Sequence, residues 1–156
     1  MEHILAAIEA SSIAQYLRVS RWGYAALNTA HVLSIAVLVG AILPLNLRLL
    51  GLWRSEPRAA LARIIVPVAA TALALAIVTG ALLFSVRATE YAPLSVFRLK
   101  LVLIALGSLG ALELHRAYGL TFAGASESRA AFHAAVSTVC WLGALICGRL
   151  IAFVME

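Results

Sequence analysis

The first long apolar stretch of the chain reads WGYAALNTAHVLSIAVLVGAILPLNLRLL over residues 22–50, and it carries no formal charge between Arg21 and Arg48. A helix needs about 20 consecutive apolar residues to cross the hydrocarbon core of a bilayer. Helix is also the state that pairs all backbone polar groups of a single segment in lipid. The stretch therefore predicts a first transmembrane helix.

Three further stretches of the same kind follow, at about residues 64–86, 96–116 and 130–154. Of the 156 residues, 63% are hydrophobic and only 12% are charged, whereas globular chains average about 25% charged residues. We therefore expect an all-α integral membrane protein in which residues 21–156 form a four-helix bundle. A bundle of this kind would be a multi-pass protein of the bacterial inner (plasma) membrane.

Residues 1–20 differ from the four spans because polar side chains interrupt them throughout. The apolar side chains that favour one side of a helix are Ile4, Leu5, Ile8, Ile13 and Leu17. A segment that is too polar to span, with one apolar face, is typical of a helix that lies in the membrane interface. We therefore predict an amphipathic interfacial helix before the first span.

The basic residues predict the orientation of the bundle and some of its partners. Outside the spans, arginines are most frequent in the loops between spans one and two and between spans three and four. Such loops favour the cytoplasm, which would place both termini in the periplasm. The net charge of +5 suits anionic lipid headgroups. The basic residues are spread over both membrane faces, which argues against binding to nucleic acid. The glycines within the spans suit association into a homo-oligomer.

His31 is the most informative residue of the first span, because titratable side chains in hydrocarbon are expensive and mark functional candidates. It lies about three turns into the span, far from a loop. Two interpretations stay open. A neutral histidine bridges two helices by hydrogen bonds, or it acts as an axial ligand or proton-handling group, since imidazole suits iron and copper alike.

Two basic residues share the membrane half of His31, because consecutive spans alternate in direction. Lys100 opens the third span, and Arg149 lies near the end of the fourth. Cationic side chains at this depth suit an anionic group such as a haem propionate or a lipid phosphate.

The opposite membrane half holds Arg48, Glu113, His115, Arg116 and His133. His115 and His133 flank the loop between the third and fourth spans at similar depth. They either ligate one iron from two helices or face water at the interface. For Glu113 we expect a structural ion pair with Arg48 or Arg116.

The two cysteines, Cys140 and Cys147, lie seven residues apart on the fourth span. The helical rise separates them by about 10 Å, which is too far for a disulfide. We expect small buried thiols that pack, although His133 shares their helical stripe and would allow a path for a soft metal.

The sparse polar positions resemble a four-helix pattern of known families. The pattern consists of a His, a Gly nine residues later and an Arg in the first span, then Thr-Gly, Lys and His-Arg, at His31, Gly40, Arg48, Thr79–Gly80, Lys100 and His115–Arg116. It is similar to the copper-resistance membrane domain of the CopD type and to the haem-containing membrane protoporphyrinogen oxidases. It also resembles an uncharacterised family of small bacterial membrane proteins with Arg-Leu-Leu-Gly after the first span and Gly-Arg in the last, as in Gly148–Arg149.

The resemblance covers roughly residues 22–150. It implies that His31 ligates a b-type haem or a metal, with Arg48 and Lys100 near that site. Three hypotheses follow. The first is a haem b protein that transfers electrons in the membrane, with quinone or other redox subunits as partners and with His115 and His133 as a second ligand pair. The second is a copper-handling or copper-transport protein that uses His31 and Cys147. The third is a structural accessory subunit without a cofactor.

Overall fold

The computed structural model describes residues 2–122 and 124–154, and its regular elements are helices. In chain order they are α1 (Glu2–Glu9), α2 (Ser12–Val19), α3 (Arg21–Leu49), α4 (Arg58–Val86), α5 (Ala88–Tyr91), α6 (Ser95–Tyr118) and α7 (Glu127–Val154). The four long helices α3, α4, α6 and α7 are long and apolar enough to cross a membrane. The predicted all-α membrane bundle is therefore confirmed.

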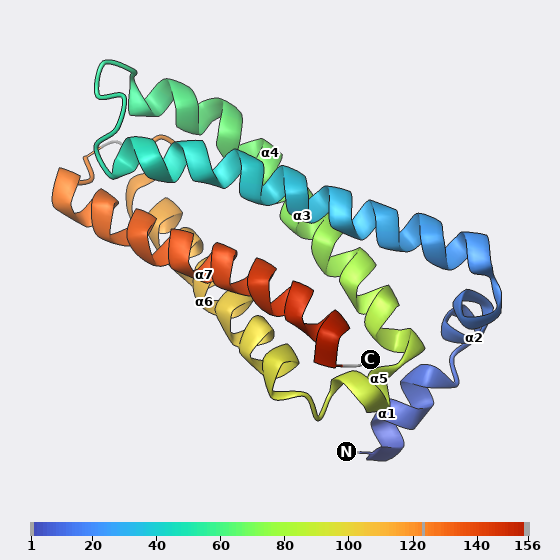
Figure 1. Cartoon of the computed structure of the whole chain (residues 1–156). Coiled ribbons are helices and arrows are strands. Elements are labelled where there is room, and N and C mark those ends of the chain that lie inside the picture. Colours follow the sequence, from blue (N-terminus) through green and yellow to red (C-terminus); the bar gives the residue numbers. More distant parts are fainter. Residues whose placement is uncertain (1, 123, 155–156) are drawn as a thin grey trace.

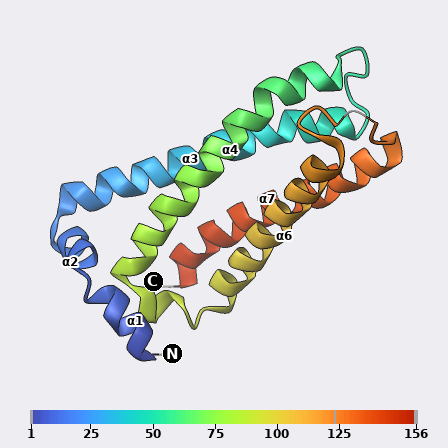
Figure 2. The ribbon, with the colours of Figure 1, turned by 180° about the vertical axis from the view of Figure 1, so that it is seen from behind.

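The four long helices form two antiparallel hairpins, α3 with α4 and α6 with α7 (Figure 1). Seen from behind, α6 and α7 run side by side as a separate pair (Figure 2). The hairpins meet where α3 packs against α7, and within the described residues no comparable contact joins α4 to α6. The packing order is therefore α4, α3, α7, α6.

The buried side chains concentrate toward the end of the bundle that carries the α3–α4 and α6–α7 loops, which we call the loop end. The larger cluster there consists of Leu45, Leu49, Ala62, Leu114, Phe122, Ala125, Ala130 and Ala134. A smaller cluster of Leu38, Ala72 and Trp141 lies nearer the middle. At the opposite end, which we call the open end, the two hairpins diverge (Figures 1 and 2). The two hairpins are thus packed most closely against each other at the loop end.

Asn46 links the two hairpins through hydrogen bonds. Its Nδ2 atom donates to Ser137 Oγ and to Thr138 Oγ1 on α7, each at 3.1 Å. The Asn46 side chain is 5% exposed, and a buried amide is costly unless it is hydrogen-bonded. These bonds therefore favour one register of α3 against α7.

The predicted N-terminal helix is present as two short helices instead of one. The first helix ends at Glu9. The Ser11 hydroxyl then caps α2 by accepting from the Ala14 amide at 3.4 Å. Both helices pack against the open end of α4, and α1 also packs against α5. Arg18 Nη2 donates to the Val86 carbonyl at 2.6 Å, at the end of α4 where helix carbonyls lack partners.

Glu9 fastens this N-terminal unit to α5. Its Oε1 atom accepts from the Thr89 amide at 2.8 Å and from Thr89 Oγ1 at 2.7 Å. Its Oε2 atom lies 3.5 Å from Arg18 Nη2. The hydrogen bonds from Thr89, followed by the charge of Arg18, hold the pKa of Glu9 below its ordinary value. The ionised carboxylate is therefore favoured in the folded protein.

We predict that acid releases the N-terminal helices from α5. Because the pKa of Glu9 is lowered on folding, the contact is at full strength above the ordinary glutamate pKa of about 4.3 and is lost as the pH falls through the lowered value. The measurement is the exchange rate of the Thr89 amide, compared at each pH with a Glu9→Ala variant. The parent should be better protected at pH 7 and equal to the variant in strong acid. Equal exchange rates in the parent and the variant at pH 7 would show that Glu9 does not stabilise the contact with α5.

Candidate functional site

His31 lies at a close approach of α3 and α4. Its Nδ1 atom is 2.9 Å from Thr79 Oγ1. A Cβ atom added at Gly80 would lie only 2.9 Å from His31 Cε1. The imidazole therefore occupies the space that the glycine leaves, and its hydrogen bond crosses between the two helices.

The bonds of Thr79 assign the tautomer of His31. A hydroxyl has one proton to donate, and Thr79 Oγ1 stands 2.6 Å from the Leu75 carbonyl. At that distance the hydroxyl proton must lie between the two oxygens. Thr79 therefore accepts from His31, so the proton of the neutral ring is on Nδ1 and the lone pair is on Nε2.

We predict that Gly80→Ala destabilises the bundle by about 1–3 kcal/mol, because the new methyl group clashes with the His31 ring. The measurement is thermal unfolding of the detergent-solubilised protein. Gly40→Ala is the matched control, since a Cβ there meets nothing within 4 Å. Equal losses in the two variants would contradict the close packing at His31.

Lys100 lies at the same end of the bundle as His31. Its Nζ atom would be 3.3 Å from a Cβ added at Gly148 on α7, so the lysine side chain packs against that helix. No carboxylate of the described residues forms an ion pair with Lys100. The structure thus brings a histidine and a lysine without an acidic partner to the open end.

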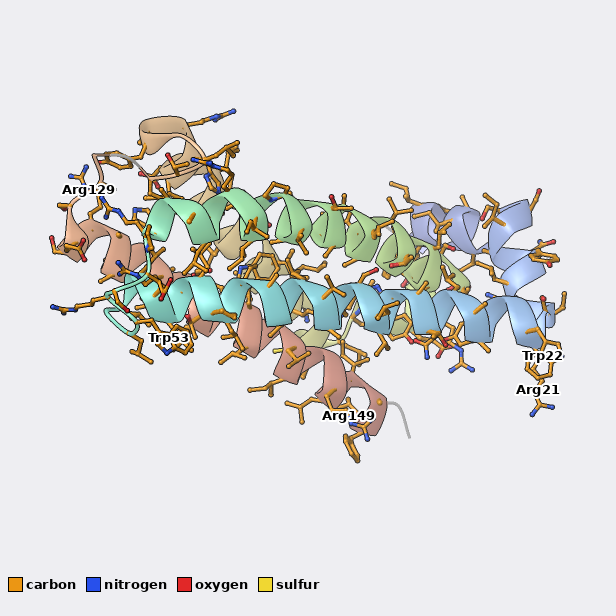
Figure 3. All side chains as sticks on the ribbon, turned by 90° about the horizontal axis from the view of Figure 1, so that it is seen from above. Arg21, Trp22, Trp53, Arg129 and Arg149 are labelled. Atoms are coloured by element: carbon orange, nitrogen blue, oxygen red, sulfur yellow. The ribbon has the colours of Figure 1, made fainter. Side chains whose placement is uncertain are left out.

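Arg149 is exposed and does not share this position. Its guanidinium carbon lies 4.8 Å from the centre of the Phe153 ring. Figure 3 shows its side chain directed away from the other helices, at the end of α7. Of the two basic residues predicted to accompany His31, Lys100 packs against α7 at the open end, whereas Arg149 faces outward.

Arg48 lies at the loop end, about 25 Å of helical rise from His31. Its side chain is 8% exposed, and Nε donates to the Glu56 carbonyl at 2.6 Å while Nη2 donates to the Arg54 carbonyl at 3.2 Å. The ion pair expected between Glu113 and Arg48 or Arg116 does not form in the described part of the chain. The guanidinium of Arg48 is instead turned into the α3–α4 loop.

That loop needs an anchor because its backbone is unusual. Gly51 has a φ of 107° and Trp53 has a φ of 48°. Residues other than glycine rarely adopt such positive φ values. The two hydrogen bonds from Arg48 hold the carbonyls that follow this turn. We infer that the role of Arg48 in this structure is to fix the loop.

We predict that Arg48→Met lowers the free energy of unfolding by about 1.5–3 kcal/mol, the range for hydrogen bonds from a charged group. Thermal unfolding measures the loss. Arg63→Met, an exposed arginine on α4, should change stability by no more than about 0.5 kcal/mol. A normal unfolding temperature for Arg48→Met would contradict the anchoring role.

His115 and His133 line one cavity at the loop end, so the structure does bring this predicted pair together. The cavity has a volume of about 190 Å³ and is lined by α3, α4, α6, α7 and Phe122. His115 Nδ1 is 3.3 Å from the Gly119 carbonyl, and the imidazole stacks on Phe122 with 5.0 Å between ring centres. Since a carbonyl only accepts, Nδ1 carries the proton and the Nε2 atom of neutral His115 is an acceptor.

Three small polar residues line the same cavity and were not singled out from the sequence: Asn46, Ser108 and Ser137. The Ser108 hydroxyl oxygen is buried and has no hydrogen-bond partner among the described residues. Neutral polar residues do not stand out in an apolar helix as charged residues do. Their role as cavity-lining residues is therefore visible only in the folded bundle. An unpaired buried hydroxyl is unfavourable, so a molecule with an acceptor oxygen would be stabilised beside Ser108.

The predicted metal ligands do not form one centre. Within residues 2–122 and 124–154, no group of three or more His, Cys, Asp or Glu side chains is arranged to hold a metal ion. His31 belongs to the open end, His115 and His133 belong to the loop end, and Cys140 and Cys147 are buried free thiols. Comparison with protein-family models, curated proteins and solved structures found no match to this chain.

Proposed function

We propose that the protein is a membrane-embedded b-type haem protein that transfers single electrons within the bilayer, with His31 as an axial ligand. The observation that supports it best is the hydrogen bond from His31 Nδ1 to Thr79. Histidines that ligate metals usually donate their other ring nitrogen to a fixed acceptor, which sets the tautomer and the ring orientation. His31 has this arrangement, in which the Nε2 lone pair would be the one that binds iron.

The surroundings of His31 fit a haem in two further respects. The ring is half-buried and belongs to the half of α3 that leads to the open end. Lys100 stands at this end without an acidic partner in the described chain, and a propionate carboxylate would neutralise it. His31 would thus hold the iron and Lys100 a propionate.

A bound haem supplies a one-electron carrier whose potential depends on axial ligation, burial and hydrogen bonding. The residues of this chain would set those conditions. Thr79 keeps the His31 ring oriented, Gly80 provides room for that ring, and Lys100 supplies a positive charge. Because the bundle is small, we further propose that it works as a subunit or partner of other redox components in the membrane.

The two ends of the bundle support the proposed orientation. Trp53 and Arg129 lie at the loop end, while Arg21 and Trp22 lie at the open end (Figure 3). Tryptophan and basic side chains anchor helices at both membrane interfaces, and arginine-rich loops favour the cytoplasm. On this basis the loop end faces the cytoplasm, and the termini and His31 belong to the periplasmic half.

The same contacts would also serve a cofactor-free accessory subunit, since the His31–Thr79 bond joins two helices. Copper handling through His31 and Cys147 is the third hypothesis. The three hypotheses predict purified proteins that differ in colour and in metal content, so absorption spectroscopy and metal analysis distinguish them.

We predict that the detergent-purified protein shows a reduced b-type absorption band that His31→Ala abolishes. Thr79→Val should weaken haem affinity about ten-fold or more, because it removes the acceptor that orients the ring. His3→Ala, an exposed histidine in α1, is the matched control and should keep the band. Oxidised and dithionite-reduced spectra measure these effects, and titration with hemin measures the affinity.

A colourless parent, expressed with ample haem, would refute the haem proposal. Copper that copurifies with the parent and is lost in His31→Ala would then favour copper handling. Loss of the band in His115 or His133 variants, with His31→Ala still coloured, would move the ligand to the loop end.

A further inference from the structure

The cavity at the loop end is suited to one small ring. Its volume of about 190 Å³ lies below the range of about 300–1,000 Å³ for drug-sized ligands. A cavity of about 150 Å³ is enough to hold benzene. The space therefore fits a single six-membered ring with small substituents, and it is too small for a haem macrocycle.

The cavity opens toward lipid between the two outer helices. Ala70 on α4 and Leu106 and Ala111 on α6 line it and are also exposed on the surface. No comparable packing closes α4 against α6 in the described residues. A hydrocarbon chain attached to a bound ring can therefore leave between these helices and remain in the membrane.

Two hydroxyl protons are available to a ligand in the cavity. Ser108 Oγ is buried without a partner. Ser137 Oγ accepts from Asn46, and none of the hydrogen bonds of the described chain uses its own proton. Thr138 differs, because its hydroxyl donates to the Ala134 carbonyl at 2.8 Å. The Ser108 and Ser137 hydroxyls would therefore donate to acceptor oxygens on a ring.

Among the described residues that line the cavity there is no Asp, Glu, Lys or Arg, so the cavity favours a neutral ligand. The titratable side chains that face it are His115 and His133, and the Nε2 atom of neutral His115 can accept a hydroxyl proton. Hydroxyls and imidazoles together suit a ring whose oxygens alternate between carbonyl and hydroxyl forms.

We propose that this cavity binds the head group of a membrane quinone, with its isoprenoid tail leaving between α4 and α6. As the redox partner of a haem, the quinone rests on the proposed function, but the binding site itself does not depend on His31. A fatty acid fits less well, because its carboxylate would find no lysine or arginine among the described lining residues. An acyl chain alone would leave the Ser108 and Ser137 hydroxyls unpaired.

Trp141 provides a direct reporter for the test, because it lines the cavity and is 5% exposed. The other two tryptophans, Trp22 and Trp53, are exposed and can be replaced by phenylalanine. The detergent-purified full chain is titrated with a short-tailed ubiquinone analogue while Trp141 fluorescence is recorded. We expect saturable quenching.

Two pairs of variants make the titration specific. Gly110→Leu should abolish saturable quenching, because Gly110 lines the cavity and a Cβ there meets nothing within 4 Å. Gly40→Leu is its control, with equally open space outside the cavity. Ser108→Ala should weaken binding about five-fold through one lost hydrogen bond. Ser85→Ala should not, since Ser85 only donates to Leu82 on α4, outside the cavity.

Linear quenching, or equal quenching in Gly110→Leu and Gly40→Leu, would refute the quinone site. Displacement of the quinone by oleate at matched concentration would show a general hydrocarbon site and refute it as well. The titration is repeated in the His31→Ala background. Saturable binding there supports the quinone site even if the protein proves colourless, whereas a haem band without saturable quenching leaves the haem proposal in place and refutes this one.

Discussion

The contact of α3 with α7 is the interaction through which two separate hairpins become one bundle. Between helices in lipid there is little hydrophobic driving force, so close packing and hydrogen bonds carry the association. Here they are the loop-end cluster of buried residues and the bonds of Asn46 to Ser137 and Thr138. Because both lie toward the loop end, the opposite end can diverge. This asymmetry separates a half-buried His31 from the cavity at His115 and His133, which lies at the loop end.

The sequence was sufficient to predict the membrane bundle, because stretches free of charge are a direct consequence of the lipid solvent. The bounds differ most at α4, which begins at Arg58 instead of residue 64. Arg58 and Arg63 are polar enough to end an apolar stretch, yet such side chains reach the interface while their helix continues. The break at Ser11 and the short α5 depend on local capping and packing, which apolar periodicity does not reveal.

The candidate sites were only partly predictable. His31 stands out because a titratable group in hydrocarbon is rare, but its acceptor Thr79 lies on another helix, and only the packing of α3 on α4 joins them. Asn46, Ser108 and Ser137 are small and uncharged, so nothing in the sequence distinguishes them from helix-packing residues. The role of Arg48 depends on hydrogen bonds to two backbone carbonyls of a loop. Because every residue has a backbone carbonyl, the sequence does not show which ones an arginine will bind. The lysine at the open end was predictable from charge and depth, whereas the outward direction of Arg149 was not.

The bond between Asn46 and Ser137 has a consequence for how the protein is made. The two residues are 91 positions apart, and ribosomes add about 5–20 residues per second, so roughly 5–18 s pass before the acceptor is synthesised. During that interval the α3–α4 hairpin is in the membrane while the side-chain amide of Asn46 has no partner on α7. Any neighbouring helix that presents a hydroxyl can capture it, so the newborn chain is most open to mispairing before its last span is inserted.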